Sequence, residues 1–334
     1  MIKARSLVGL LTLIVIMTIS WFYFSYQQFL SAPIVKQQSL VFEVKAGSGA
    51  NAVLSQLVSE ELTSQEWFGR IFLKLHPELT QVKAGRYLLS PSMTIHDVFE
   101  LLVSGKQIQY TFTIVEGLTF NQVVRMLLQH GEIDTTDLKG LNDKQIFEAL
   151  DLKYDHAEGA LFADTYHFPA GYNAADLLRR SHQRLLAVLE EEWSERQSNL
   201  PYQTPYQALI MASIIEKETA LESERATIAG VFVRRLQKKM RLQTDPTVIY
   251  GIGENFDGNI TRKHLRTDTP YNTYTRRGLP PTPIAIVGRE AIHAALNPEP
   301  GSALYFVAKG DGSHQFSDTL EEHNQAVKKY QLKQ

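Results

Sequence analysis

The chain has 334 residues, enough for about two domains, and its 34 basic residues nearly balance 36 acidic ones, leaving a formal net charge of −2. This near-neutral charge argues against a dedicated nucleic-acid-binding protein, which usually carries a strongly basic surface. An apolar fraction of 44% excludes wholesale disorder. The absence of cysteine excludes disulfides, thiolate metal sites and a cysteine nucleophile.

The N-terminus predicts a membrane anchor. Lys3 and Arg5 precede an almost wholly apolar run at 7–24, and the next charge is Lys36. At about 1.5 Å per residue, this run comes close to the ~30 Å hydrocarbon core of a bilayer. A cleaved signal peptide typically has a shorter apolar region and a small-residue cleavage site. We therefore expect a cytoplasmic segment at 1–6, a transmembrane helix at 7–26 and a linker at 27–40, with the remaining chain outside the cytoplasm.

Two segments of the exported chain resemble each other. Residues 42–57 and 112–127 each contain a short alternating run, a glycine and apolar positions at helical spacing, which predicts a strand, a turn and a helix. With a second strand and a helix near 95–104, residues 41–108 form an α+β module that resembles the LysM-like subdomain of some cell-wall enzymes. Residues 109–334 are expected to form a mixed α/β domain with helices near 174–197, 222–239 and 320–330.

The most informative helix is predicted to begin at Pro205, with Thr204 as its N-cap. Residues 206–215 are apolar on nearly every side, which indicates a buried helix. Helical spacing makes Glu218 continue the apolar stripe, whereas Glu216 points to the opposite side. A poorly solvated carboxyl group keeps its proton to higher pH, as a general acid for glycosidic cleavage requires. The pattern alone fits equally a helix that leaves the core with both glutamates solvated.

Polar loops after this helix contain candidate substrate-binding residues. Hydroxyl, amide and aromatic side chains suit sugars, whose ring faces stack on aromatics and whose hydroxyls need hydrogen-bond partners. With Glu216, the candidates are Gln243, Thr244, Asp245, Tyr271, Asn272 and Tyr274. Each is also typical of a proline-rich surface loop. The histidines show no metal-ligand spacing, and we interpret His314 and His323 as structural; no metal and no cofactor are expected.

Five motifs in order resemble one known family. They are residues 158–166 (EGALFADTY), 212–219 (ASIIEKET), 242–250 (LQTDPTVIY), 269–274 (TPYNTY) with 278–284 (GLPPTPI), and 322–324 (EHN). With the apolar N-terminus, this order looks like that of the YceG-like endolytic murein transglycosylases over essentially the whole chain. The chain departs from the pattern twice. Ala163 stands where the family commonly has proline, and Ile286-Val287 stands where it usually has Asn-Pro before a glycine.

The resemblance implies a membrane-anchored lytic transglycosylase with Glu218 as its essential residue. Such an enzyme cuts β-1,4 bonds between N-acetylmuramic acid and N-acetylglucosamine in nascent glycan strands, and so helps to end their elongation. We expect Glu218 to protonate the leaving oxygen and then to accept a proton from the muramoyl C6 hydroxyl, which gives a 1,6-anhydro end.

The resemblance also implies partners and a location. The expected partners are peptidoglycan glycan strands, the membrane through the N-terminal helix, and peptidoglycan synthases of the elongation or division machinery; no nucleic acid is expected. The expected location is the cell inner membrane, with a cytoplasmic N-terminus and a periplasmic catalytic domain. Two alternatives stay open: a non-catalytic peptidoglycan-binding scaffold, and a hydrolytic muramidase that uses Glu218 with Asp245.

Overall fold

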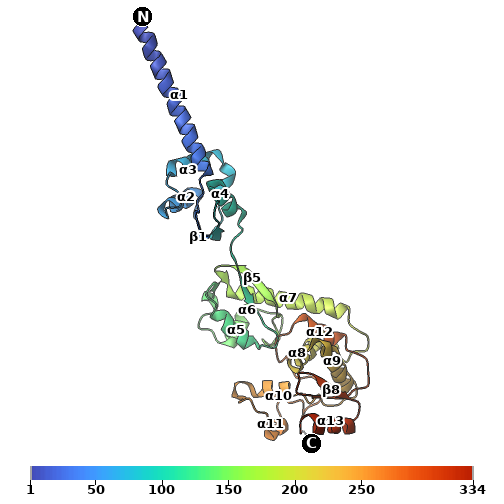
Figure 1. Ribbon diagram of the computed structural model, residues 1–334. Helices are drawn as coiled ribbons and strands as arrows, with labels where there is room; N and C mark the ends of the chain where they lie inside the picture. Colours follow the sequence, from blue (N-terminus) through green and yellow to red (C-terminus); the bar gives the residue numbers. More distant parts are fainter. Residues whose placement is uncertain (1, 333–334) are drawn as a thin grey trace. The chain divides into compact units, whose positions relative to one another are not determined.

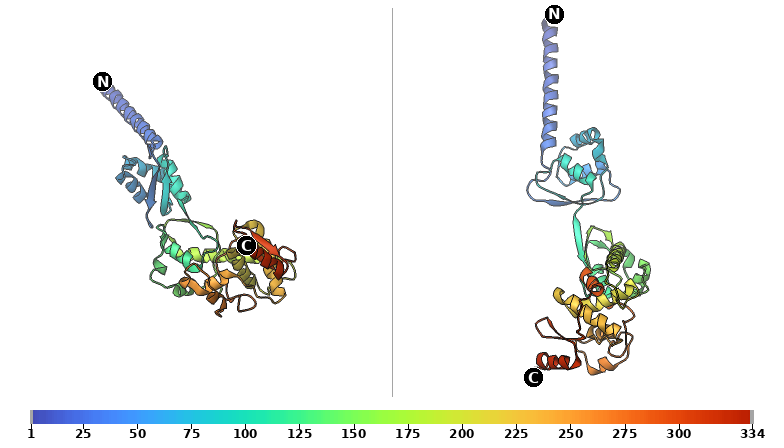
Figure 2. Two further views of the ribbon diagram at one scale, coloured as in Figure 1. Left: turned by 60° about the horizontal axis from the view of Figure 1, so that its bottom comes forward. Right: turned by 90° about the vertical axis from the view of Figure 1, so that its right-hand side faces the viewer.

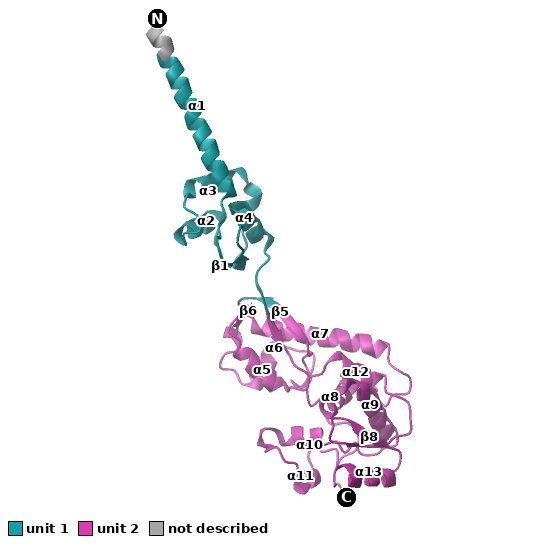
Figure 3. Ribbon diagram, viewed as in Figure 1, with its two compact units in different colours: residues 1–110, 168–170 teal, residues 111–167, 171–334 magenta. Residues whose placement is uncertain are grey.

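The structure is a computed structural model that describes residues 2–332. It has the mixed α+β architecture and the long apolar N-terminal helix that the sequence predicts. The ends of two expected segments, residue 1 of the cytoplasmic segment and residues 333–334 of the C-terminal domain, lie outside the described residues. The chain divides into two compact units, residues 1–110 with 168–170 and residues 111–167 with 171–334 (Figure 3).

Unit 1 consists of a long helix and a small α+β module. Helix α1 is Ile2–Ser31, and its segment Leu7–Ser31 is long and apolar enough to cross a membrane, a property that anchors and signal sequences share. The module contains β1 (Leu40–Val44), α2 (Ala50–Ser59), α3 (Glu66–Leu75), a 3-10 turn (Pro77–Thr80), β2 (Gly85–Leu89) and α4 (Ile95–Ser104). Strands β1 and β2 pair antiparallel, and Tyr87 of β2 shares a buried core with Phe68 of α3 and Phe99 of α4.

The segment 27–40, where the sequence suggests a linker, is packed against this module. Helix α1 continues to Ser31, and the side chains of Phe29, Ile34 and Val35 are 7%, 6% and 3% exposed. The Ile34 N–H also donates to the Met93 carbonyl oxygen at 2.7 Å. The apolar helix therefore leads directly into the core of unit 1 (Figures 1 and 2).

Both copies of the internal repeat form the predicted strand, glycine turn and helix. The second copy consists of β3 (Gln109–Thr113) and α5 (Phe120–Leu128). Gly47 and Gly117 have φ angles of 81° and 77°, in the left-handed region that favours glycine. Each glycine therefore turns the chain from its strand into the following helix.

The core of unit 2 forms around helix α8, Pro205–Glu218. The Thr204 hydroxyl accepts a hydrogen bond from the Gln207 N–H, and Pro205 is the first helical residue, as the sequence predicts. Every side chain from 208 to 215 is buried. Helices α7 (Ala174–Ser194), α9 (Glu222–Gln237) and α12 (Arg289–Leu296) pack against α8. The C-terminal end of α8 lies at a cleft in unit 2.

The other elements of unit 2 are short. They are β4 (Ile133–Asp134), a 3-10 turn (Thr136–Leu138), α6 (Asp143–Leu150), β5 (Thr165–Pro169, whose last residues belong to unit 1), β6 (Tyr172–Asn173), α10 (Asp245–Ile252), a 3-10 turn (Gly253–Asn255), α11 (Arg262–Arg266), β7 (Tyr305–Ala308), β8 (His314–Ser317) and α13 (Leu320–Tyr330). Strand β3 pairs with β5, β4 is parallel to β6, and β7 and β8 form an antiparallel hairpin. The helices expected near 174–197, 222–239 and 320–330 are confirmed as α7, α9 and α13.

Candidate active site

A cleft of about 530 Å³ lies at the C-terminal end of α8. Its walls come from α8, α9, the loop before α10, the β7–β8 hairpin and α13, all of which belong to unit 2. Five of the residues predicted from the sequence line it, namely Glu218, Gln243, Thr244, Asp245 and Tyr274. The cleft therefore brings together predicted residues from three separate segments of the chain.

Glu218 is the last residue of α8 and is partly buried in this cleft. Loss of hydration raises the pKa of Glu218 to about 7, and the neighbouring Asp245 charge also raises it. The Thr244 hydroxyl donates a hydrogen bond to Glu218 Oε1 and opposes this rise, as do the charges of His314 and Arg235. A carboxyl group with a pKa near neutrality can both donate and accept a proton. The sequence-based expectation that Glu218 is poorly solvated is therefore confirmed.

Hydrogen bonds to Thr273 and Arg235 hold the loop that contains Thr244. The Gln243 N–H donates to the Thr273 carbonyl oxygen at 3.3 Å, and the Thr244 N–H donates to Thr273 Oγ1 at 3.1 Å. The Arg235 guanidinium donates to the Leu242 carbonyl oxygen at 2.7 Å. Gln243 itself has a φ of 54°, which is uncommon for a residue with a side chain. These contacts fix the hydroxyl of Thr244 beside Glu218.

Aromatic and cationic side chains form the opposite side of the cleft. The Tyr274 hydroxyl donates to Asp245 Oδ1 at 2.6 Å. The Arg235 guanidinium lies 5.0 Å from the ring centre of Tyr305, and the His323 ring stacks on Tyr305 with ring centroids 5.2 Å apart. A cleft with aromatic rings and hydrogen-bonding groups around the carboxyl group of Glu218 is suited to a sugar chain.

Sequence reasoning missed several of these residues. Arg235 belongs to a basic run that resembles a solvated helix face, and no pattern singles out Tyr305. His314, which we interpreted as structural, lines the cleft, and its Nδ1 lies 2.7 Å from Glu224 Oε2. His323 also lines it; the EHN motif at 322–324 is the one sequence signal that marks this position.

Three predicted substrate-binding residues do not line this cleft. Glu216 lies on the other side of α8, where it pairs with Arg225 at 3.5 Å and accepts a hydrogen bond from the Gly288 N–H at 3.3 Å. The buried Asn272 amide donates to three main-chain carbonyl oxygens of the segment 264–267. The Tyr271 hydroxyl shares a 2.8 Å hydrogen bond with Thr282. These contacts stabilise loops, and a substrate contact by any of the three stays a prediction.

A second buried carboxyl group, Glu158, lies in a separate pocket of about 680 Å³. Burial raises the pKa of Glu158 to about 7. Its Oε1 accepts hydrogen bonds from the Phe120 N–H at 3.0 Å and the Gly159 N–H at 3.4 Å. Because Phe120 is the first residue of α5, Glu158 satisfies an N–H group that has no partner within the helix. We interpret Glu158 as a structural residue.

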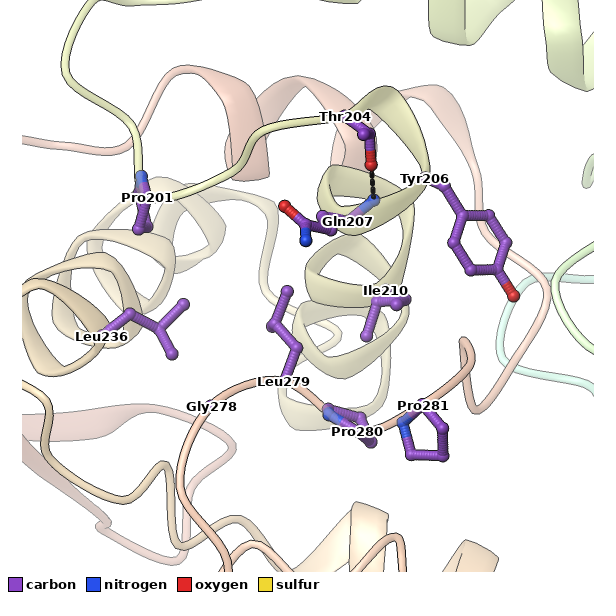
Figure 4. A pocket seen from close by; sticks show the side chains of 10 residues that line it. All are labelled: Pro201, Thr204, Tyr206, Gln207, Ile210, Leu236, Gly278, Leu279, Pro280 and Pro281. Carbon is purple, nitrogen blue, oxygen red and sulfur yellow. Dashed lines mark hydrogen bonds between the residues drawn. The ribbon is translucent and has the colours of Figure 1, made fainter.

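Another pocket, of about 520 Å³, lies at the N-terminal end of α8 (Figure 4). Figure 4 shows the Thr204 side chain bonded to the Gln207 main chain, with Pro280 and Pro281 across the pocket. None of the residues lining this pocket carries a carboxyl or imidazole group. The cleft at Glu218 is therefore the better candidate for proton-transfer chemistry.

The two departures from the family pattern fall in an ordered region. Ile286 and Val287 are fully buried, and the Ile286 N–H donates to the Leu118 carbonyl oxygen at 2.7 Å. The Ala163 N–H donates to the Val287 carbonyl oxygen at 3.1 Å. Main-chain pairing thus holds this segment, and Ile284 is tied to α8 by a hydrogen bond from its N–H to Ser213 Oγ at 3.0 Å.

A partly buried acid at the edge of an apolar helix, surrounded by hydroxyl groups and aromatic rings, is typical of enzymes that cleave glycosidic bonds. The model of the YceG-like family matches residues 42–329, and the chain belongs to this family.

Named relatives agree with this assignment. A Bacillus subtilis protein named endolytic murein transglycosylase is 31% identical over 326 residues, covering 92% of this chain and 89% of that protein. A Streptococcus pneumoniae protein of the same name is 28% identical over 348 residues, covering 91% of this chain but 61% of that protein. The crystal structure of a YceG-like protein from Listeria monocytogenes is similar with a TM-score of 0.54 and 32% identity, covering 87% of this chain and 100% of that one. The relatives that carry a functional name are thus named as lytic transglycosylases of murein.

Proposed function

We propose that this protein is a membrane-anchored endolytic transglycosylase that cleaves β-1,4 bonds between N-acetylmuramic acid and N-acetylglucosamine in nascent glycan strands. The observation that carries the proposal is Glu218, whose carboxyl group has a pKa raised to about 7 and lies at the end of a buried helix, inside a cleft. The names of the relatives support the choice of murein as the substrate. By releasing nascent strands the enzyme would terminate glycan elongation.

In the proposed reaction Glu218 acts first as an acid and then as a base. Its proton passes to the glycosidic oxygen as the bond to the muramoyl C1 breaks, so that the leaving sugar departs as an alcohol. The muramoyl C6 hydroxyl then attacks C1, and its proton passes to the Glu218 carboxylate. The product carries a 1,6-anhydro ring, and Glu218 regains its proton for the next turnover. The Thr244 hydroxyl stabilises the carboxylate that forms between these two steps.

Neighbouring side chains are proposed to orient the sugars. Gln243 and Asp245 line the cleft beside Glu218 and can pair with acetamido or hydroxyl groups. Tyr274 provides an aromatic surface in the same cleft, on which the apolar face of a sugar ring can stack. Glu216, Tyr271 and Asn272 have no such support from the geometry.

We further propose the domain organisation and location that the sequence implies. Residues 41–108 are assigned to a LysM-like module, supported by the order strand, helix, helix, strand, helix with antiparallel β1 and β2. Residues 109–334 are assigned to the catalytic domain, and α1 to a retained inner-membrane anchor with its N-terminus in the cytoplasm and the catalytic domain in the periplasm. Peptidoglycan synthases of the elongation or division machinery are the proposed protein partners.

Product analysis with purified sacculi tests the proposed reaction. The wild-type protein should release fragments with 1,6-anhydro ends, identified by mass spectrometry, and E218Q should lose at least about 100-fold in rate because it cannot transfer a proton. The control is E158Q, which alters a buried glutamate of similar pKa outside the cleft and should keep activity. Circular dichroism of both variants checks that each folds.

The same digest separates the alternatives. Fragments with reducing muramic acid ends would identify the protein as a hydrolytic muramidase instead. This is the second candidate function, because Asp245 lies in the same cleft as Glu218 and could act as the second carboxylate. Uncut strands that still retain the wild-type protein would indicate a binding scaffold. An E218Q protein with full activity would reject Glu218 as the acid.

A further inference from the structure

A large aromatic side chain of unit 1 lies at the end of the apolar helix and has no role in the cleft. Trp67, the second residue of α3, is 46% exposed. Its ring stacks on Phe68 with centroids 3.7 Å apart, and it lies 5.4 Å from the ring of Phe22 on α1. An exposed tryptophan beside the apolar helix indicates a binding surface, because a large aromatic side chain removes much apolar area from water when a partner covers it.

The contact between Trp67 and α1 is fixed by a column of aromatic rings. Phe22, Tyr26 and Phe29 lie on one face of α1, and their ring centroids are 5.6, 5.5 and 5.6 Å from that of Phe68. Phe29 and Phe68 are both buried in the core of unit 1. Because α1 enters this core without a free linker, the position of α3 along the axis of α1 is set by packing (Figures 1 and 2).

The position of Phe22 along α1 gives the depth of Trp67. The apolar segment begins at Leu7 and, at about 1.5 Å per residue, reaches Phe22 after roughly 22 Å, which places Phe22 about 8 Å from the outer border of a hydrocarbon core that is ~30 Å thick. Trp21, Tyr23 and Phe24 surround Phe22 and are 65%, 65% and 71% exposed. Such aromatic clusters mark the border between acyl chains and headgroups. Trp67, in contact with Phe22, lies at the same level.

We infer that Trp67 and the outer face of α3 are a second membrane-contact surface, which inserts into the headgroup region of the outer leaflet beside the anchor. An indole ring suits this region because its body is apolar and its N–H can bond to headgroups. Lys74 follows Trp67 at helical spacing on the same face and is exposed, so that it can contact lipid phosphates. Arg70 lies on this face too, where it pairs with Glu66 at 2.8 Å. The inference rests on the proposed anchor, and it means that the membrane orients the small module instead of only tethering it.

Depth-dependent fluorescence quenching tests this contact in the full-length protein. The chain has three tryptophans, Trp21, Trp67 and Trp193, and three variants each keep one of them with phenylalanine at the other two positions. Each variant is reconstituted into phosphatidylcholine–phosphatidylglycerol vesicles that contain phosphatidylcholine brominated either near the headgroup or near the chain ends. The W21F/W193F variant reports Trp67 alone, W67F/W193F reports the anchor, and W21F/W67F reports unit 2.

The expected result is a blue-shifted Trp67 emission that loses most of its intensity with the shallow bromolipid and little with the deep one. Trp21 should also be quenched, whereas Trp193, which lies in unit 2 over Arg196, should respond only to aqueous acrylamide. Quenching of Trp21 without quenching of Trp67 would overturn the inference and leave the anchor intact. Absence of quenching at both positions would overturn the anchor and the inference together.

Discussion

In the proposed reaction Glu218 first donates a proton and then accepts one, and its surroundings set the pKa that these two roles require. A group that first donates and then accepts a proton works best when its pKa lies near the working pH. Burial and Asp245 raise the pKa of Glu218, and the Thr244 hydroxyl lowers it, with a result of about 7. Because the protonated form begins the reaction, activity should fall as pH rises through about 7.

Replacement of Thr244 by valine should move this limb of the pH profile. The hydroxyl donates to Glu218 and stabilises the charged carboxylate, so that its removal raises the pKa of Glu218 and keeps the acid form to higher pH. For a hydrogen bond worth about 1 kcal/mol, the shift is roughly one pH unit upward in kcat measured on isolated glycan strands. The control is T247V, which removes a buried hydroxyl that bonds to the Thr244 carbonyl oxygen and does not contact Glu218. An unmoved limb in T244V would contradict this account of the pKa.

At the scale of elements, the position of Glu218 depends on how α8 is joined to the segment after Pro283. The hydroxyl of Ser213, fully buried on α8, accepts a hydrogen bond from the Ile284 N–H and donates to the Ile210 carbonyl oxygen. This hydroxyl links the helix to the motif at 278–284. A main-chain N–H buried in this region has no water to replace a lost partner.

The S213A variant should therefore be destabilised. Removing the acceptor leaves the buried Ile284 N–H unsatisfied, which costs about 1–3 kcal/mol in the free energy of unfolding. The matched control is S194A, in which an exposed serine at the end of α7 loses a hydrogen bond to its own helix and should change by less than about 0.5 kcal/mol. Urea denaturation followed by circular dichroism measures both. Equal stability of the two variants would show that water or another group satisfies this N–H.

The sequence predicted the helices better than the loops because the signals that define helix ends are local. Thr204 and Pro205 mark the start of α8, and the helix expected at 95–104 ends at Gly105 with a φ of 75°. Helical spacing placed Glu218 on the apolar stripe of α8, but the pattern fitted a solvated side chain equally well, and only the packed cleft shows its burial. Loop side chains carry no such periodicity. Asn272 reads as a ligand-binding amide in the sequence, yet its amide bonds to the carbonyl oxygens of a neighbouring turn, a contact that only the folded loop defines.

At the scale of the whole molecule, the cleft and the packing of the apolar helix α1 into unit 1 both depend on contacts between distant segments. Arg235 lines the cleft because α9 folds back along α8, and Tyr305 because the β7–β8 hairpin covers it. Ile34 and Val35 form a short apolar run directly before the polar residues 36–39, too short to indicate burial, and so residues 27–40 resemble a linker in the sequence. Tertiary packing, not local pattern, decides these positions.

The stability of unit 1 should therefore depend on where a truncated chain begins. A chain that starts at Gln27 lacks most of the apolar span but keeps Phe29, Ile34 and Val35, whereas one that starts at Lys36 loses all three. Burial of each such side chain contributes about 1.5–3 kcal/mol, so that the shorter chain should lose several kcal/mol in unit 1. Hydrogen exchange should then be much faster for the amides of β1 and β2 in the shorter chain, with α8 of unit 2 as the internal control. Equal protection of β1 and β2 in both chains would mean that the segment before Lys36 only lies on the module without stabilising it.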